Sequence, residues 1–388
     1  MSDQIIQEKT PNPALKVLRV MTTIVGMFFS ICLIAVFCYN LVLSSGTKET
    51  VYQEKAAGVT IMDKYDMYVN NAIADALDGV LAIEKVYWLS DSDQVAPEPN
   101  QACFGEVSSY EELKPILEKA EELLAGQTLA FTPDRPVWDG DSIHYYLDET
   151  ILAFTWKEVV DGAIYTVAEV KLAHPSQFRR FLAGGEFGSA QQYVTTEMAA
   201  SVNAVLASSG DFYTYAKYGA VVYEGELRRF EGKMLDTCFI NDEGDLLFKY
   251  RGELETEEQA KQFIKENNVR FSLAFGPVLL DNGENKVPFT YGRGEVEGTY
   301  SRAALCQWDK LHYLVVNTSQ EAGYWHRHKM KFFAEFIKEL GCKTAYALDG
   351  GQTTAIVMND ELITLPDYGN QRRISDIIYF ATALPNGG

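Results

Sequence analysis

Residues 344–360 read TAYALDGGQTTAIVMND, and this sequence predicts two strands with a single carboxylate between them. Its first part, 344–348, has the apolar composition of a buried strand, and 353–358 forms a second strand before an Asn-Asp turn. Between the two strands, Asp349 precedes a pair of glycines, which lets backbone approach a ligand closely. A tight turn in which Asp349 bonds to its own backbone explains the same pattern, and the spacing alone favours that turn.

Strands and helices are mixed around this stretch without a regular βαβ rhythm. Short β-like runs are expected at 145–147, 151–156 and 164–172, and helices at 195–207, 256–267 and 329–340. Thr256 and Gln259 have the spacing of a capping box, and Gly341 is placed to end the last helix. The pattern predicts an α+β domain with a mixed β-sheet and packed helices.

The N-terminal region contains an uncharged run long enough to cross a membrane. Residues 20–43 carry no charged side chain, and their number exceeds the ~20 that a transmembrane helix needs. The apolar region of a cleaved signal peptide is shorter, about 7–15 residues. We therefore expect a cytoplasmic tail over 1–19 and a retained signal-anchor helix over 20–43. The protein would be a single-pass cell-membrane protein whose C-terminal domain is extracytoplasmic.

A helical stalk is expected directly after this transmembrane helix. Apolar side chains recur at three- and four-residue steps between Met62 and Tyr87, flanked by Asp, Asn and Lys. Such a helix either packs on the domain that follows or pairs with a second copy to form a homodimer. The stripe is too short to decide between these two arrangements.

The stretch from 90 to 101 is polar and contains proline, which is typical of a linker. After it, Ser109 and Glu112 have a capping-box spacing that opens a further helix. We therefore expect a membrane-proximal region of helix and linker over 44–135, and a folded domain over 136–388.

The composition indicates a packed domain and excludes a nucleic-acid partner. Hydrophobic residues make up 47% of the 388 positions and aromatic residues 12%, which is ample for a core. The formal net charge of -20 would repel a polyanion, and no basic stripe is present. The six cysteines include no C-x-x-C pair, and those beyond the apolar run are expected to be buried free thiols.

Three further short segments place a glycine, a carboxylate or an arginine after a regular element. They are SSGDFY at 208–213, FGPVL at 275–279 and SRAA at 301–304. For Asp211 the spacing alone favours a helix C-cap and turn over a ligand contact, and a surface ion pair explains Arg302 as well as a ligand contact does.

In combination, these segments resemble the phosphodiester glycosidase family, whose bacterial relatives include exopolysaccharide-biosynthesis proteins. The helix TTEMA at 195–199 followed by SSGDFY is similar to the family's N-G-[DG]-[FY]-[FY] segment. FGPVLLDNG fits G-P-x-L-x-x-x-G, SRAALC fits R-[TA]-A-[IL]-G, and TAYALDGGQTT fits A-x-x-L-D-G-G-G-[ST]-[ST]. Arg373-Ile374-Ser375 is assigned to the closing R-x-[VI]-[SA]. The four main segments occur in the family's order over roughly 145–383.

The chain departs from these patterns at three positions. Ser209 stands where asparagine is usual, which changes any sugar contact made there. Gln352 replaces the third glycine and narrows the room beside the loop, and Cys306 replaces the glycine after R-x-A-x.

The resemblance implies a hydrolase, a glycosidase that cleaves sugar-1-phosphodiester linkages in cell-envelope glycans or exopolysaccharide. Glycoside hydrolysis generally uses two carboxylates, and Asp349 and Asp211 are the expected catalytic pair, without a decision on which has which role. Arg302 is expected to bind the phosphate, because a guanidinium matches it in a fork. The remaining expected substrate-binding residues are Ser209, Gly210, Gly350, Gly351 and Thr353. No cofactor or metal is expected, and the partners are a sugar-phosphate or glycopolymer substrate and the membrane.

Two alternatives remain open at this point. His326 and His328, together with Asp349, have the residue types of a metal-assisted phosphodiesterase, although their basic neighbours favour a solvated turn. The family departures also allow a non-catalytic module that binds envelope glycopolymer.

Overall fold

The computed structural model describes residues 89–90, 93–124, 128–215, 217–292, 296–319, 321 and 328–384. The chain divides into two compact units, 1–53 and 54–388, and every described residue belongs to the second. The expected tail, transmembrane helix and stalk therefore lie outside the described residues. Within the described ranges, no helix is long and apolar enough to span a membrane.

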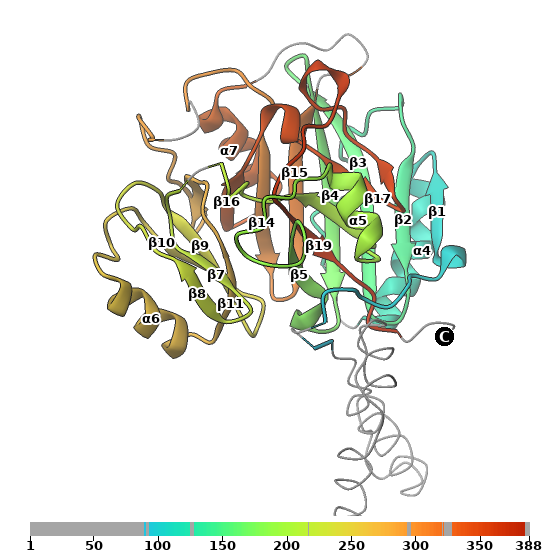
Figure 1. Ribbon diagram of the computed structural model, residues 1–388. Coiled ribbons are helices and arrows are strands. Elements are labelled where there is room, and N and C mark those ends of the chain that lie inside the picture. The colour runs from blue at the N-terminus through green and yellow to red at the C-terminus, as the bar shows by residue number, and fades with distance from the viewer. Residues whose placement is uncertain are drawn as a thin grey trace, which may run out of the picture. The chain divides into compact units, whose positions relative to one another are not determined.

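A nine-stranded sheet forms the centre of the domain (Figure 1). Its order is β1 (Phe104–Val107), β2 (Ile143–Leu147), β3 (Ile151–Val160), β4 (Ala163–Leu172), β15 (His312–Ser319), β14 (Ala303–Asp309), β16 (Thr344–Leu348), β12 (Val278–Asp281) and β13 (Glu284–Asn285). β3 and β4 are buried along almost their whole length, because both faces of the sheet are covered. This fits their composition, in which seven of the ten residues of each strand are hydrophobic.

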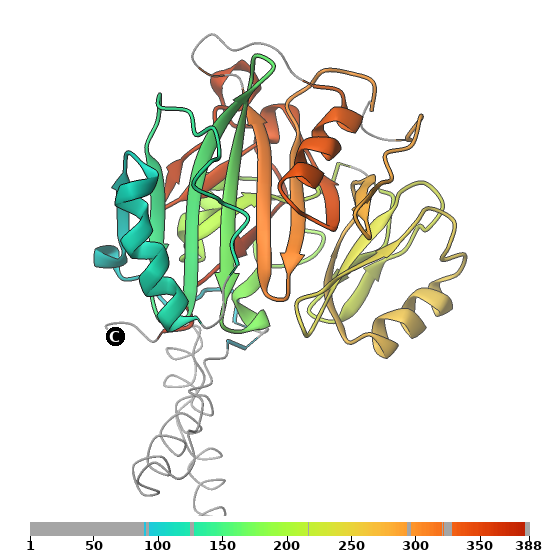
Figure 2. The same ribbon diagram turned by 180° about the vertical axis from the view of Figure 1, so that it is seen from behind.

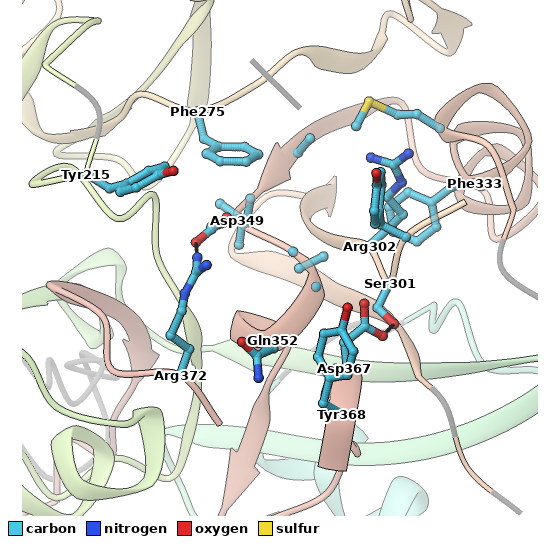
Figure 3. A pocket seen from close by; sticks show the side chains of 17 residues that line it. Tyr215, Phe275, Ser301, Arg302, Phe333, Asp349, Gln352, Asp367, Tyr368 and Arg372 are labelled. Atoms are coloured by element: carbon cyan, nitrogen blue, oxygen red, sulfur yellow. Dashed lines mark hydrogen bonds and ion pairs between the residues drawn. The ribbon is translucent and has the colours of Figure 1, made fainter. Parts of the chain in front are cut away.

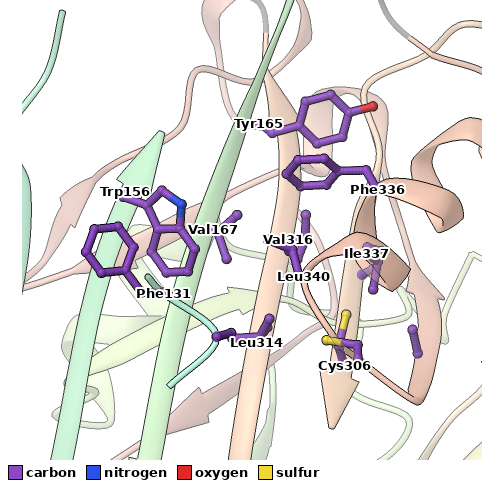
Figure 4. Packing of buried hydrophobic residues seen from close by; sticks show 14 of the residues in the cluster. Phe131, Trp156, Tyr165, Val167, Cys306, Leu314, Val316, Phe336, Ile337 and Leu340 are labelled. Atoms are coloured by element: carbon purple, nitrogen blue, oxygen red, sulfur yellow. The ribbon is translucent and has the colours of Figure 1, made fainter. Parts of the chain in front are cut away.

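Two helices cover one face of this sheet (Figure 2). They are α4 (Tyr110–Leu123) and α7 (Met330–Glu339), and their apolar sides share one buried cluster with the sheet. Figure 4 shows the centre of this cluster, where Phe336 packs on Tyr165 at 4.1 Å between ring centroids. In α7, buried residues at three- and four-residue spacing form the stripe expected of a surface helix. Gly341, with φ 90°, ends the helix as expected.

A five-stranded sheet packs on the other face. Its order is β18 (Glu361–Leu362), β17 (Ile356–Met358), β6 (Leu206–Ser209), β19 (Asp376–Phe380) and β5 (Phe178–Leu182). Phe178 and Phe380 from this sheet stack at 4.9 Å and contact Tyr313 of the nine-stranded sheet. The short helix α5 (Thr195–Ser201) lies on the outer face of the five-stranded sheet.

A smaller lobe is formed by residues 221–273, which follow β6 and precede β12 in the sequence. It contains the hairpin β7 (Val221–Tyr223) and β8 (Glu226–Arg229), the sheet β10 (Leu246–Lys249), β9 (Thr237–Asn241) and β11 (Val269–Leu273), and the helix α6 (Glu257–Glu266). α6 packs on the sheet through Phe263 and Phe239, whose rings lie 5.1 Å apart. The expected capping box is present: the Thr256 hydroxyl accepts the Gln259 N–H.

The expected α+β class is confirmed in coarse form, as a sheet-rich domain with a few packed helices. Every described strand pair is antiparallel, however, whereas the sequence analysis expected a mixed sheet. The helix expected over 195–207 ends at Ser201, because Asn203 adopts φ 56° and the next residues enter the centre of the five-stranded sheet as β6. The four cysteines in the described ranges are free, and three of them are buried.

Residues expected to precede the domain pack against it. β1 pairs with β2, and α4 contributes Leu113 and Ala120 to the main core. The stretch interpreted as a linker is also held, since the Tyr379 hydroxyl donates to the Gln94 carbonyl at 3.0 Å and Ala96 N–H donates to Val202. The domain boundary expected at residue 135 stays a prediction. The residues before it pair with or pack on the sheets that the residues after it form.

Candidate active site

A cavity of about 500 Å³ opens where β16 ends and β14 begins (Figure 3). These two strands are antiparallel neighbours, with Leu348 opposite Ala303, so their adjoining loops meet at the same edge of the sheet. The loop after β16 brings Asp349 to the cavity, and the residues just before β14 bring Ser301 and Arg302. The structure thus collects two of the segments that the sequence analysis singled out.

Asp349 is a largely buried carboxylate facing this cavity. Its side chain is 12% exposed, and Arg372 Nη2 lies 3.0 Å from its Oδ2. Burial raises the pKa of Asp349 to about 6, and the charge of Arg372 and a hydrogen bond from Thr353 limit this rise. A carboxyl group with a pKa near the working pH is suited to acid–base chemistry.

The glycine pair after Asp349 is required by close backbone packing. A Cβ atom on Gly350 would lie 2.5 Å from the Ser301 carbonyl oxygen, and Gly351 has φ 67°. Gly351 N–H donates to the same carbonyl at 2.9 Å, and the Thr353 hydroxyl donates to the Gly350 carbonyl at 2.8 Å. These bonds fix the loop, while Arg372 holds the Asp349 carboxylate, which faces the cavity.

Arg302 lies on the opposite side of the cavity from the Asp349–Arg372 pair (Figure 3). Its backbone N–H donates to the Thr318 hydroxyl at 2.7 Å, and its guanidinium donates to the Gly298 carbonyl. The guanidinium also lies 5.8 Å from the centre of the Tyr300 ring. The cavity therefore has an arginine on each side, an arrangement that suits a phosphate between them.

Asp211 does not line the cavity, in contrast to its expected pairing with Asp349. Its side chain is fully buried, with Arg180 Nη2 at 2.6 Å and the Ala274 N–H donating to it at 2.6 Å. Arg180 also contacts Asp376 at 2.9 Å. Burial raises the pKa of Asp211, and the adjoining Arg180 opposes that rise. A carboxylate enclosed in this way does not fit direct contact with a substrate.

The turn that contains Asp211 instead supports the wall behind Asp349. Asp376 accepts the N–H groups of Asp211 at 3.1 Å and Phe212 at 2.8 Å. A Cβ atom on Gly210 would lie 2.0 Å from Asp376 Oδ2, which explains the glycine. The Gly210 carbonyl accepts the Asp349 N–H at 3.3 Å, and the Ser209 hydroxyl donates to the Asp349 carbonyl at 3.3 Å.

The expected substrate-binding residues are thus divided by the structure. Gly350 and Gly351 line the cavity, as does Arg302. Ser209 and Thr353 are buried and bond to the loop around Asp349, which makes them supports of that loop. Of the other family departures, Gln352 lines the cavity and Cys306 is buried inside β14.

Sequence reasoning missed several residues of the cavity, above all Arg372. It assigned the closing motif to Arg373, whose side chain is 58% exposed and lies 3.6 Å from Glu197. The pattern R-x-[VI]-[SA] fits when it starts at Arg372 instead, and this was the signal in the sequence. A second carboxylate, Asp367, and three tyrosines (Tyr215, Tyr300 and Tyr368) also line the cavity. They lie in loops without periodicity, and no pattern pointed to them.

Neither of the two histidines considered for a metal site is among the described residues that line the cavity. His326 lies outside the described residues, and the His328 ring packs on Phe332 at 4.0 Å between centroids and bonds to the Tyr165 hydroxyl. Among the residues that the structure describes, no three His, Cys, Asp or Glu side chains are grouped to hold a metal ion.

The family model for the phosphodiester glycosidases matches residues 202–381, a range that contains Arg302, Asp349 and Arg372. This match supports the resemblance to the phosphodiester glycosidases that the sequence segments indicated. No curated protein sequence matches the chain.

Solved structures show likeness at low identity. One is a hypothetical protein from Synechocystis, with a TM-score of 0.44 and 14% identity, covering 62% of this chain and 64% of that one. The alignment thus spans less than two thirds of the Synechocystis protein. The catalytic domain of zebrafish N-acetylglucosamine-1-phosphodiester alpha-N-acetylglucosaminidase has a TM-score of 0.48 and 17% identity, over 66% of this chain and 87% of that one.

Proposed function

We propose that this domain is a glycosidase that hydrolyses the bond between a sugar and the phosphate of a sugar-1-phosphodiester. The observation that carries the proposal is a cavity lined by Asp349, whose pKa is about 6, and by two arginines, Arg302 and Arg372. The match of residues 202–381 to the phosphodiester glycosidases supports the same reaction class.

The two arginines supply the charge that the leaving group needs. When the bond between the anomeric carbon and oxygen breaks, the electron pair stays on the phosphate oxygen. Arg302 from the β14 side and Arg372 from the loop before β19 would stabilise that developing charge. A phosphomonoester already carries stabilised negative charge, so its departure needs little help from a protonating group.

Asp349 is proposed to act on the sugar side of the bond. A group with a pKa of about 6 is mostly ionised at pH 7, which suits a nucleophile or a base that activates water. Glycosidases generally use a second carboxylate, and Asp367 is the other one among the described lining residues. Its Oδ1 accepts the Ser301 hydroxyl at 2.6 Å, and Figure 3 shows it across the cavity from Asp349. We propose Asp367 in place of Asp211 as the partner.

The membrane anchor, the source of the substrate and the homodimer are also part of the proposal. The uncharged run at 20–43 supports a single-pass membrane anchor with the domain outside the cell. An envelope or exopolysaccharide glycan would then be the accessible substrate, and the stripe between Met62 and Tyr87 would allow a homodimer.

The position of bond cleavage tests this function directly. The full chain is required, because β1 and α4 lie before residue 136 and are part of the fold. It would be incubated in ¹⁸O-labelled water with methyl phosphodiesters of glucose, galactose and N-acetylglucosamine at C1. Cleavage between carbon and oxygen places the label in the free sugar and releases methyl phosphate. Label in the phosphate would instead show a phosphodiesterase and reject the glycosidase.

A further inference from the structure

The wall of the cavity includes three exposed tyrosines. Tyr215, Tyr300 and Tyr368, called here the aromatic mouth, all line it, and their exposed fractions are 65%, 50% and 82%. They come from three separate loops, after β6, before β14 and after β18. Single exposed aromatic residues are ordinary, but several gathered at one cavity indicate a binding surface.

Tyr368 occupies a backbone conformation that its side chain does not favour. Its φ is 64° and its ψ is 12°, in the left-handed region where glycine and asparagine are preferred. Because the Tyr368 ring is exposed, its burial contributes little free energy to offset the cost of this backbone conformation. The turn is held at the cavity wall by the preceding residue, Asp367, which accepts the Ser301 hydroxyl. Folding alone therefore does not explain a tyrosine here, and strain of this kind gathers at functional sites.

Each of the other two tyrosines lies near an arginine of the cavity. Arg372 lies 6.0 Å from the centre of the Tyr215 ring, which also stacks on Phe212 at 5.4 Å with 24° between planes. Arg302 lies 5.8 Å from the centre of the Tyr300 ring. Each ring is thus placed beside a cation of the proposed phosphate site.

We propose that the aromatic mouth binds sugar rings beyond the one that is cleaved, so that the substrate is a glycan chain bearing the sugar-1-phosphodiester. This inference rests on the proposed function. The face of a sugar ring presents C–H groups, which pack against the electron-rich face of an aromatic ring. The hydroxyl groups at its edge would then reach the polar groups between the tyrosines.

The charges within the mouth distinguish a glycan from a lipid. Arg302, Arg372, Asp367 and Gln352 line the same cavity as the three rings. An acyl chain placed across them would cover charged and polar groups without forming hydrogen bonds to them, which is costly. Sugar hydroxyl groups both donate and accept, so a glycan satisfies these groups while it covers the rings.

Binding to oligosaccharides of increasing length tests this inference. The full chain, in detergent micelles, would be titrated with fluorescently labelled oligomers of one to six glucose or N-acetylglucosamine units. Tyr368→Asn removes the ring and keeps a residue suited to the left-handed backbone, so its melting temperature should be unchanged or higher. Tyr368→Phe keeps the ring. Phe289→Asn is the matched control, since Phe289 is 86% exposed and does not line the cavity.

We expect affinity to increase with oligomer length in the unaltered protein, Tyr368→Phe and Phe289→Asn. Tyr368→Asn should lose between about two- and tenfold in affinity for the longer oligomers and almost nothing for the single sugar. Equal binding by Tyr368→Asn and the unaltered protein, or no glycan binding at all, would overturn the inference. So would tighter binding of a methyl-to-octyl series of alkyl phosphodiesters.

Hydrolysis of the methyl phosphodiesters, measured in parallel, separates this inference from the proposed function. Cleavage of a single-sugar phosphodiester without any dependence of binding on length would reject the glycan mouth and leave the glycosidase. Length-dependent binding without cleavage of any phosphodiester would reject the glycosidase. The mouth would then belong to a non-catalytic glycan-binding module.

Discussion

Replacing Arg372 by glutamine should shift the pH dependence of the proposed hydrolysis. Arg372 Nη2 lies 3.0 Å from Asp349 Oδ2, so removing its charge removes the main group that favours ionised Asp349. At this separation, two unit charges interact by about 1.4 kcal/mol in water and by about 5.5 kcal/mol at an effective dielectric constant of 20. Because the arginine side chain is 42% exposed, solvent screens the pair and the lower figure applies.

About 1.4 kcal/mol corresponds to one pKa unit, so the pKa of Asp349 should rise from about 6 to about 7 in Arg372→Gln. If ionised Asp349 is the nucleophile or base, kcat/KM increases as pH rises through this pKa. The midpoint of that increase should lie near pH 6 in the unaltered protein and about one unit higher in the variant.

The assay is a pH profile of kcat/KM from pH 4.5 to 9 on whichever methyl phosphodiester is cleaved. Arg373→Gln is the matched control, because Arg373 is exposed and pairs with Glu197 instead of Asp349. A uniform loss of activity in Arg372→Gln, with its midpoint unmoved, would refute the electrostatic reasoning. Activity that falls as pH rises through 6 would show that Asp349 works as a protonated acid.

Three other predictions concern the two aspartates and the dependence of activity on a metal. Asp349→Asn should lower kcat by about 10²–10⁴-fold. It should also stabilise the fold at pH 7 by up to about 3 kcal/mol, measured by urea unfolding, because a raised carboxyl pKa costs stability as pH rises from 3.8 towards 6 and the amide avoids that cost. Asp211→Ala should destabilise the fold by about 3–5 kcal/mol, because Arg180 would stay buried with one partner fewer, and a small change would contradict its supporting role. Activity should survive EDTA, and its loss with recovery on adding zinc or manganese would support the metal-assisted alternative.

The regular elements around the site could be predicted because their signals are local. The strand expected at 344–348 is β16 with the same bounds, and the helix expected at 329–340 is α7 within one residue. Apolar spacing and capping residues decide such elements over a few turns of chain. The helix at 195–207 was overextended because Leu206 and the residues around it suit a buried strand as well as a helix, and only tertiary packing decides between them.

The site itself could be predicted only in part, because it depends on contacts between distant segments. Gln94, in the stretch interpreted as a linker, is bonded to Tyr379 near the other end of the chain. Tyr368 reaches the cavity because its turn is tied to Ser301 through Asp367. A sequence pattern records which residues neighbour one another along the chain, and none of these pairs are neighbours.

Asp349 and Asp211 illustrate what the sequence pattern lacks, which is the position of the arginine that each carboxylate contacts. Asp349 and Asp211 both follow a strand of the sandwich, and both pair with an arginine, at 3.0 Å and 2.6 Å. The difference lies in the arginine. Arg180 belongs to β5 and is completely buried, so its pair with Asp211 is closed to any ligand, whereas Arg372 lies in a loop and keeps its pair at the cavity. The position of the partner arginine, on a buried strand or in a loop at the cavity, therefore decides which aspartate a ligand can reach. It is the reason why we propose catalysis for Asp349 and a supporting role for Asp211.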